Sequence, residues 1–419
     1  MKSEGAHEWD VAVVGGGPAG MMAAGRAAEL GLCVVLIEKN AELGKKLLIT
    51  GGGRCNVTNA EFDTRVLLAK FKDAGKFLAS PFSQWAAEQS IHFFNARGMP
   101  TKIEAEKRVF PESDRARSVW NVLVEYLKAG KVEVMTKSAV SRILSEGNSV
   151  MGLELKNGRV IRAKNYILAT GGTSHPETGS TGDGYAWLRA LGHTVSEAKA
   201  ALVPVAVKDA RVKRAAGVAL KSAKLTLFQN NVKQASRAGK ILFTHVGLSG
   251  PAILNMSRDV GELLKYGAVF IEIDLLPDMG YEKVNEALLA ALAKHANKKI
   301  RNALSPLIPP ALVPLVLEIA EIDAETPSNS LKREARVRLM KTLKHLRFEA
   351  KGLLGMDKAV ITAGGVALTE VDFRTMRSLK YDNLYLVGDI LDIDRPSGGY
   401  SLQLCWTTGF VAGSGAATK

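Results

Sequence analysis

The hydrophobic and polar positions change their spacing several times along the chain, and each spacing predicts a different kind of element. Near the N-terminus, the apolar run at 11–14 predicts a buried strand, and apolar residues at helical spacing over 19–30 predict a helix. A second apolar run at 34–37 predicts another buried strand. This strand–helix–strand order is typical of a parallel sheet, so we expect an α/β fold that begins with a βαβ unit.

The spacing alternates between helical and strand-like in the rest of the chain. Helical spacing predicts helices over 71–94 and 118–128, and alternation predicts a small meander over 132–162. The remaining segments are, in order, a strand at 166–169, a β-rich region at 202–274, a helical region at 281–346 broken by the prolines of 305–310, a strand at 384–387 and a helix after 399.

The turn between the first strand and the first helix has the sequence GGGPAG. Gly15 would permit the tight turn, Gly17 would let a pyrophosphate approach the backbone, and Gly20 would let the helix pack closely on the strand. The phosphates would lie at the helix N-terminus formed by Pro18 and Ala19, where unpaired N–H groups and the helix dipole favour negative charge. This glycine spacing between a strand and a helix predicts a dinucleotide site.

Later segments favour FAD as the dinucleotide. Glu38 ends the second strand, where an acid can accept a hydrogen bond from a ribose hydroxyl. A second glycine-rich loop, TGGGRCNVTN, follows two lysines, and a FAD protein uses such a loop along the pyrophosphate and the flavin. Two strands end in ATGG and VGD, and a glycine-led helix after the second would stabilise reduced flavin with its N-terminus. We expect non-covalent FAD to contact Gly15, Gly17, Pro18, Ala19, Gly20, Glu38, Lys39, Lys45, Lys46, Thr50, Gly51, Gly52, Arg54, Asn56, Val140, Thr170, Gly171, Gly388, Asp389, Gly398, Gly399 and Tyr400.

Composition narrows the class of protein. The length of 419 residues predicts two or three domains, and 47% hydrophobic with 23% charged residues is ordinary globular composition. No apolar run approaches the ~18 residues that span a bilayer, and the polar N-terminus lacks the apolar core of a signal peptide. Cys33, Cys55 and Cys405 are too widely spaced for a disulfide framework or a metal site. We therefore expect a cytoplasmic protein without a metal or a membrane partner.

The net charge is unusual for a metabolic enzyme. The chain has 56 Lys and Arg against 42 Asp and Glu, a net charge of +14. The segment 208–240 has nine basic residues and one acidic residue, and the segment 332–351 has eight and two. Such a surplus is typical of proteins that approach polyanions, so the two stretches predict a face for structured RNA. A basic but inert surface is the alternative.

The motifs together resemble the HI0933-like (BaiN and aminoacetone-oxidase type) family of FAD-dependent oxidoreductases. The matching segments are GGGPAGMMAA, GKKLLITGGGRCNVTN, RVFPESDRA, FTHVGLSGPAIL, ITAGGVALTEVD and LYLVGDILDI with GGY, which together extend through nearly the whole chain. One departure is SLQLCWTTG after GGY, where many members have an aromatic-rich helix. The contacts beneath the flavin are therefore expected to differ.

The resemblance implies a Rossmann-type, glutathione-reductase-like FAD-binding domain with an inserted β-barrel-like domain and a small helical domain. We expect the FAD-binding domain at 1–200 and 350–419, the β-rich domain at 201–280 and the basic helical domain at 281–349. The sequence has no second strand–GxGxxG–helix unit, which favours NAD(P)H as a transient electron donor. Some members of the family have been linked to dihydrouridine formation in large-subunit ribosomal RNA, and others to small-molecule substrates.

Two residues are candidates for catalysis beside the flavin. Cys55, in the second glycine-rich loop, would either protonate a substrate or only pack in the core. His245, in THVGLSGP, would either bind an anionic substrate or make a structural hydrogen bond. Arg54 lies among glycines and is expected to contact a phosphate or the flavin O4.

Three functions remain open on the sequence. The enzyme could reduce a base of structured RNA, or act on a small amine, ketone or enone. It could also be an RNA-binding protein in which FAD is structural. Salt-sensitive RNA binding would favour the first function over the second, and absence of flavin turnover with NAD(P)H would favour the third.

Overall fold

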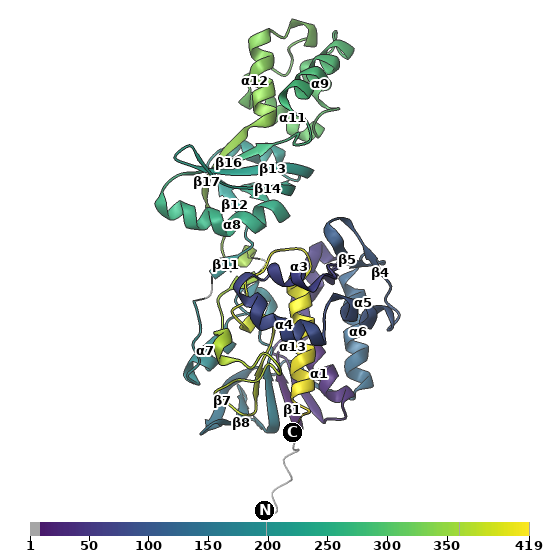
Figure 1. The fold of residues 1–419 in the computed structure, drawn as a ribbon, viewed down its shortest axis with the longest axis vertical. Helices are drawn as coiled ribbons and strands as arrows, with labels where there is room; N and C mark the ends of the chain where they lie inside the picture. Colours follow the sequence, from purple (N-terminus) through teal and green to yellow (C-terminus); the bar gives the residue numbers. More distant parts are fainter. Residues whose placement is uncertain (1–8, 198, 360, 419) are drawn as a thin grey trace, which may run out of the picture. The chain divides into compact units, whose positions relative to one another are not determined.

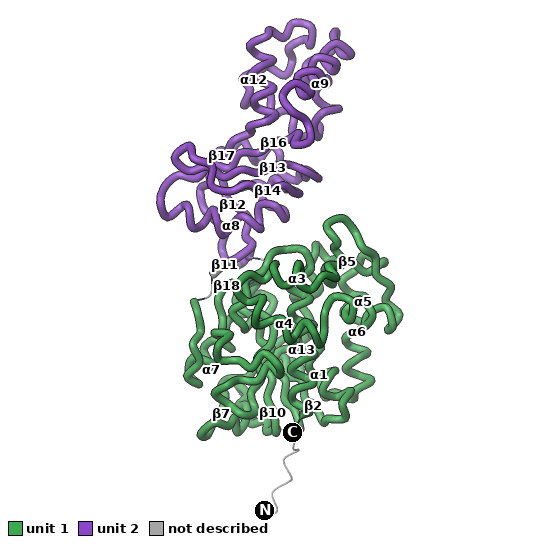
Figure 2. The backbone as a smooth tube through the Cα atoms, viewed as in Figure 1, with its two compact units in different colours: residues 1–200, 360–419 green, residues 201–359 purple. Residues whose placement is uncertain are grey.

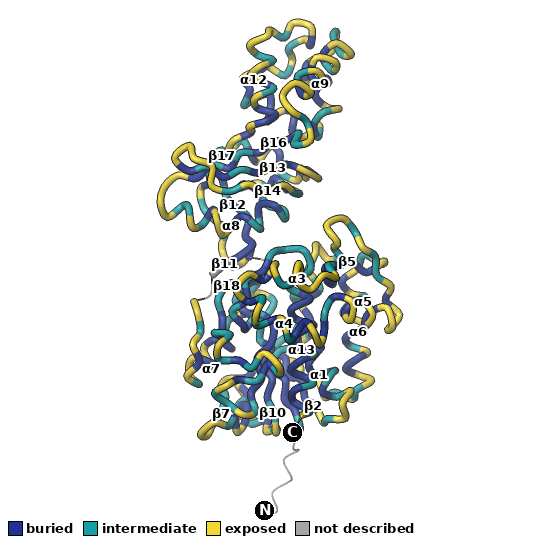
Figure 3. The backbone as a smooth tube through the Cα atoms, viewed as in Figure 1, coloured by how far each residue is buried: buried dark blue, intermediate teal, exposed yellow. Residues whose placement is uncertain are grey.

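The computed structural model describes residues 9–197, 199–359 and 361–418. The chain divides into two compact units, unit 1 with residues 1–200 and 360–419 and unit 2 with residues 201–359 (Figure 2). Each unit buries its own cluster of hydrophobic side chains (Figure 3). The two ends of the chain therefore build one unit, and the middle of the chain builds the other.

Unit 1 contains a five-stranded parallel sheet in the order β19-β10-β1-β2-β6. Because parallel strands end at the same edge of a sheet, the segments that follow them meet there. The C-terminal part of the chain supplies β19, which pairs with β10 and so completes the sheet. The strands are β1 (Trp9–Val14), β2 (Val34–Ile37), β6 (Glu133–Met135), β10 (Ala163–Leu168) and β19 (Leu384–Leu386).

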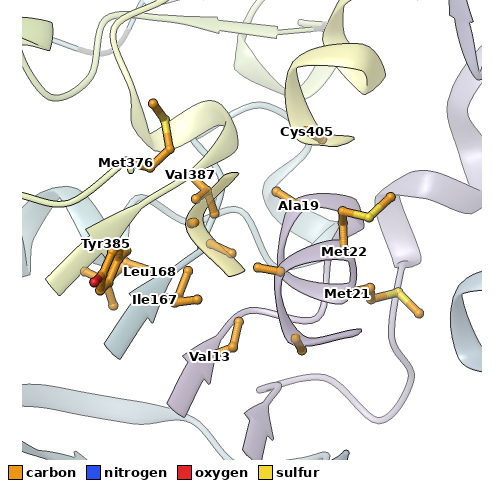
Figure 4. Close-up of a cluster of buried hydrophobic side chains, with 14 of the residues drawn as sticks. Val13, Ala19, Met21, Met22, Ile167, Leu168, Met376, Tyr385, Val387 and Cys405 are labelled. Atoms are coloured by element: carbon orange, nitrogen blue, oxygen red, sulfur yellow. The ribbon is translucent and has the colours of Figure 1, made fainter. Parts of the chain in front are cut away.

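Two helices from opposite ends of the chain, α1 (Pro18–Glu29) and α13 (Tyr400–Gly415), pack against each other (Figure 1). Their close approach depends on small residues of α13. A Cβ atom at Gly409 or at Gly413 would lie 2.5 Å from a carbonyl oxygen of α1. Strands and helices together enclose the core, in which Val13, Met21 and Val387 belong to one buried cluster (Figure 4).

The rest of unit 1 surrounds this sheet. A three-stranded antiparallel sheet has the order β7-β8-β9, and a second has the order β3-β5-β4. These strands are β3 (Thr58–Asn59), β4 (Thr101–Ile103), β5 (Arg108–Pro111), β7 (Val140–Glu146), β8 (Ser149–Leu155) and β9 (Val160–Ile161). The helices are α2 (Lys45–Ile49), α3 (Thr64–Ala69), α4 (Gly75–Gln84), α5 (Ala87–Asn95), α6 (Ala116–Ala129) and α7 (Asp183–Ala190).

Unit 2 contains a closed six-stranded barrel in the order β12-β15-β14-β13-β16-β17. Alternate residues along β16 are buried, as the period-two pattern requires for a sheet with one covered face. The barrel strands are β12 (Val205–Val207), β13 (Ala219–Gln229), β14 (Val232–Phe243), β15 (Gly247–Ser249), β16 (Val269–Asp274) and β17 (Leu346–Leu353). The helices are α8 (Pro251–Leu263), α9 (Tyr281–Lys294), α10 (Ile300–Leu304), α11 (Val313–Ile319) and α12 (Arg333–Lys344).

Where the chain passes between the units, β11 (Lys199–Ala201) pairs with β18 (Ile361–Ala363). The predicted fold class, a Rossmann-type α/β fold with an inserted barrel and a helical region, is confirmed. The β-rich region also contains α8, and the barrel is closed by β17, which follows the last helix of unit 2. Division of the chain into three domains, one at 1–200 with 350–419, one at 201–280 and one at 281–349, remains a prediction. Within the described residues, no helix is both long and apolar enough to cross a membrane.

Candidate functional site

A large cavity lies in unit 1, where β1, β2, β10 and β19 end. It encloses about 1230 Å³ of empty space, including the part that opens to solvent. Gly15 and Asp389, from opposite ends of the chain, both line it.

Most of the residues predicted to contact FAD line this one cavity. They come from the first glycine turn, the end of β2, helix α2, the start of β7 and the ends of β10 and β19. The predicted residues found here are Gly15, Gly17, Pro18, Ala19, Glu38, Lys39, Lys45, Lys46, Thr50, Val140, Thr170, Gly171, Gly388 and Asp389.

The other predicted contact residues do not line the cavity. Gly20 lies beneath the first turn, where a Cβ atom would be 1.9 Å from the carbonyl oxygen of Gly15. Gly399 contacts β3 instead, where a Cβ atom would be 2.4 Å from the backbone of Thr58. Outside the cavity lining are Gly20, Gly51, Gly52, Arg54, Asn56, Gly398, Gly399 and Tyr400.

The first glycine turn presents the N-terminus of α1 to the cavity. Gly15 has a φ of +104°, and a Cβ atom there would lie 2.4 Å from the carbonyl oxygen of Ala169, so only glycine fits. At Gly17 a Cβ atom would meet nothing within 4 Å, because this position faces open space. No side chain caps α1 and its first turn contains no acidic residue. Its unpaired N–H groups are therefore open to an anion.

Glu38 is buried beside this turn, with 7% of its surface exposed. Its carboxylate accepts hydrogen bonds from the backbone N–H of Gly16 at 2.7 Å and of Asn40 at 2.7 Å. The side-chain amide of Asn40 also donates to it, at 2.8 Å. Glu38 thus holds the glycine turn in shape as well as placing a carboxylate at the cavity.

Two lysines at the cavity are held in different ways. Lys39 donates to the hydroxyl of Thr181 at 2.6 Å and forms an ion pair of 2.8 Å with Asp183, at the start of α7. Lys46 donates to the buried hydroxyl of Ser174 at 3.0 Å. Burial lowers the pKa of Lys46, and the carboxylate of Asp389 opposes this shift. The cavity therefore has cationic groups that can meet phosphate.

The cavity residues fit FAD. The buried hydroxyl of Thr170 lines the cavity and has no hydrogen-bond partner among the described residues, so it is available to a ligand. Gly17 and the α1 N-terminus would receive the pyrophosphate, and Glu38 the ribose. Lys46 and Asp389 would face the remainder of the cofactor. When bound there, FAD would supply hydride-transfer chemistry, and the chain would supply its binding and its electrostatic surroundings.

The residues proposed for catalysis are not among those that line this cavity of unit 1. Cys55 is fully buried, does not line the cavity, and burial raises the pKa of its thiol to about 12. His245 is exposed between β14 and β15 of unit 2. The guanidinium of Arg54 pairs with Glu104 and Asp114, each at 2.5 Å, and stacks on the ring of Phe110 at 4.1 Å. The charge of Arg54 is therefore already matched within the protein.

The sequence interpretation missed one wall of the cavity. Residues 178–181 and Asp183, in the segment TGSTGD, line it together with Trp187. Two glycines of this segment, Gly179 and Gly182, have positive φ angles of +108° and +81°. A glycine-rich polar segment soon after the strand end ATGG was the available signal. Cys405 of α13 is buried and also lines the cavity.

The fold and this cavity define a flavoprotein of the FAD-dependent oxidoreductase class. The chain belongs to the HI0933-like family, because the model described as "HI0933-like protein Rossmann domain" matches residues 9–415. The resemblance inferred from the motifs is therefore confirmed.

Relatives with known names match the chain over nearly its whole length. A "3-dehydro-bile acid delta(4,6)-reductase" of Clostridium scindens is 32% identical, over 98% of this chain and 99% of that protein. A "Ribosomal RNA dihydrouridine synthase" of Escherichia coli is 31% identical, over 97% of each chain. Among solved structures, a 3-ketosteroid-delta4-(5alpha)-dehydrogenase of Rhodococcus jostii is similar with a TM-score of 0.56 and 16% identity, over 100% of this chain and 99% of that chain. This last similarity bears on the fold alone.

Proposed function

We propose that this protein reduces the 5,6 double bond of a uracil in large-subunit ribosomal RNA, in the cytoplasm, with NAD(P)H as electron donor. The reaction adds one hydride and one proton to the two carbons of the double bond and leaves dihydrouridine. The N-terminus of α1, Glu38 and Asp389 would hold FAD, which would supply the chemistry for hydride transfer between the nicotinamide and the base. The relatives named as ribosomal RNA dihydrouridine synthases support this assignment.

The observation that carries the proposal is the charge of unit 2. Residues 201–359 contain 25 Lys and Arg against 15 Asp and Glu, so unit 2 has a net charge of +10 out of the chain's +14. Neutralising phosphates releases counterions, which gives RNA binding its affinity and its salt dependence. A net positive charge concentrated in one unit is better suited to binding a polyanion than to binding a small substrate.

Part of this charge is free of acidic partners. The hairpin of β13 and β14 exposes five cations, and no carboxylate of the described residues forms an ion pair with any of them. These cations are Lys221, Lys224, Lys233, Arg237 and Lys240. The hairpin is therefore the strongest candidate for contact with RNA phosphates.

Helix α12 provides a second group of cations. Lys332, Arg333 and Lys341 are exposed, and no carboxylate of the described residues forms an ion pair with them. Arg338 instead donates to the carbonyl oxygen of Ala320 at 3.1 Å. Four other cations of the two basic stretches are paired: Lys208 with Glu349, Arg211 with Asp209, Arg214 with Glu318 and Lys344 with Asp274.

A small-molecule reductase is the second candidate. The bile acid reductase of Clostridium scindens is as similar to this chain as the RNA-modifying relatives are. A steroid-like enone would need the same hydride and proton transfer as a uracil. The two candidates differ in whether the cations of unit 2 take part.

The test compares two triple charge reversals in the FAD-loaded protein. One variant carries Lys332→Glu, Arg333→Glu and Lys341→Glu, at the exposed cations of α12 and its N-cap, and the control carries Lys70→Glu, Lys76→Glu and Lys131→Glu on unit 1. Both change the net charge equally. We expect only the α12 variant to bind a large-subunit RNA fragment at least tenfold more weakly, with a shallower salt dependence and unchanged FAD content.

Three results would contradict the proposal. If the α12 variant and the unit 1 control bind RNA with the same affinity and the same salt dependence, the cations of α12 have another purpose. If the wild-type protein oxidises NAD(P)H with an enone but not with RNA, the small-molecule function takes first place. No oxidation of NADH or NADPH with either substrate would favour a structural FAD.

A further inference from the structure

Arg395 is the most deeply buried charged side chain near the cavity. Its side chain is 0% exposed, and an arginine is rarely buried to this extent unless it is paired. It lies between β19 and α13, and the sequence interpretation gave Arg395 itself no role. Burying a guanidinium is costly unless all of its donors are satisfied, so the position calls for a reason.

All three nitrogens of this guanidinium have a partner. One terminal nitrogen forms an ion pair with the carboxylate of Asp389, and the other donates to the carbonyl oxygen of Ile393 at 2.8 Å. Nε donates to the hydroxyl of Ser401 at 3.0 Å. Ser401 lies in the first turn of α13 and Asp389 follows β19, so Arg395 ties the strand end to the helix start.

The partners of Arg395 reach the cavity directly. Asp389 and Ser401 both line it, and the side chain of Asp389 is 15% exposed there. Arg395 is bonded to one of the two carboxylate oxygens of Asp389, Oδ1. Tyr185 donates to the carbonyl oxygen of Asp389 at 2.8 Å and fixes the backbone as well. Arg395 therefore sets the orientation of a group that FAD would contact.

The charges around this part of the cavity do not cancel. Arg395 forms an ion pair with Asp389, and Lys46 lies within electrostatic range of the same carboxylate, so these three groups together carry one positive charge. The first turn of α13 contains no acidic residue, so its N-terminus adds to the same sign. A buried positive charge favours the reduced form of a flavin, which is the more negative form. The low dielectric constant of the protein interior strengthens this effect of the positive charge on the flavin.

We propose that Arg395 is a positioning residue that orients Asp389 toward FAD and raises the reduction potential of the bound flavin. The proposal concerns the flavin site and holds for either candidate substrate. Two separate quantities should therefore depend on Arg395: the affinity for FAD, and the reduction potential of the bound flavin.

The experiment measures FAD content and the midpoint potential of bound FAD in five variants of the full chain. Arg395→Met removes a cation and Asp389→Asn removes an anion, so their effects on the potential have opposite signs. The double variant removes both and leaves the net charge of the cluster as in the wild type. Arg377→Met is the matched control, because this arginine is 40% exposed and pairs with Asp382 at 3.5 Å, outside the cavity lining.

We expect Arg395→Met to shift the ratio of reduced to oxidised FAD about tenfold toward oxidised, which is a fall of about 30 mV for a two-electron couple. Asp389→Asn should raise the potential, and the double variant should return near the wild-type value. Both single variants should bind FAD at least tenfold more weakly. Arg395→Lys, which keeps the charge but loses the fork of donors, should lose affinity with a smaller change in potential.

The outcomes that overturn the proposal are specific. Equal potentials in Arg395→Met, Arg377→Met and wild type would remove the charge effect. A fall of potential in Asp389→Asn would contradict its sign. If Arg395→Met fails to fold because Asp389 is left unpaired, the double variant still decides, since full FAD content in it would show that this pair does not position the cofactor.

Discussion

At the scale of single residues, the site depends on side chains that are held by partners far away in the sequence. Glu38 supports the glycine turn through Gly16, and Arg395 supports Asp389 at the opposite end of the chain. The three glycines of the first turn have different physical roles. Gly15 and Gly20 are required by contacts within the protein, whereas Gly17 faces the cavity.

This difference between the glycines gives a prediction. Gly17→Val should prevent FAD binding but cost only about 1 kcal/mol of the free energy of unfolding, as for an unfavourable N-cap residue. Gly20→Val should cost more than about 3 kcal/mol, because its side chain would overlap the backbone of Gly15. Absorbance at 450 nm and thermal melts measure the two quantities. A Gly17→Val protein with full FAD content would refute the pyrophosphate position.

The cysteines provide a prediction on pH. Burial raises the pKa of both Cys55 and Cys405 to about 12, whereas Cys33 is exposed. Because the thiolate is the reactive form, iodoacetamide at pH 8 should modify Cys33 alone in the folded protein and all three cysteines after denaturation. The unfolded thiols ionise near pH 9 and the folded ones near pH 12, so stability should fall as pH rises through this interval. Rapid modification of Cys55 at pH 8 would argue that it is accessible to substrate.

Arg54 shows which part of the site could not be predicted. Its position among glycines favoured a cofactor contact, but Glu104 and Asp114 pair with it. These carboxylates lie 50 and 60 positions further along the chain, and nothing in the local sequence indicates that the fold brings them together. In contrast, Gly15, Glu38 and Asp389 could be placed because each follows a recognisable strand of a parallel sheet.

At the scale of elements, the contact of α1 with α13 holds the two ends of the chain together. The hydrophobic spacing predicted both helices, and the final glycine-led helix begins at Tyr400. The hydrophobic spacing did not predict that α1 and α13 would contact each other. The signal was present in Gly409 and Gly413, which lie four residues apart and therefore on one face of α13.

A substitution in this contact should be destabilising. Gly413→Ala places a Cβ atom 2.5 Å from the carbonyl oxygen of Ala23, and should cost about 1–3 kcal/mol of the free energy of unfolding, as overpacking does. Gly352→Ala is the control, because a Cβ atom there meets nothing within 4 Å. Urea unfolding monitored by circular dichroism compares the two. Equal free energies of unfolding for the two variants would show that α1 and α13 can move apart at little cost.

At the scale of the whole molecule, the chain divides its tasks between two units. Unit 1 has the FAD cavity, and unit 2 has most of the net positive charge. The order of elements and the family motifs predicted both the FAD-binding unit and the inserted unit. Which cations are free could not be predicted, because ion pairs such as Lys208 with Glu349 join segments far apart in the sequence.

The central claim, that the flavin of unit 1 reduces a uracil of ribosomal RNA, is tested most directly by mapping dihydrouridine in large-subunit RNA from a strain that lacks the gene. We expect dihydrouridine to disappear from one or a few positions in the deletion strain. The wild-type chain should restore it, and the Gly17→Val chain should not. An unchanged dihydrouridine map in the deletion strain would contradict the account.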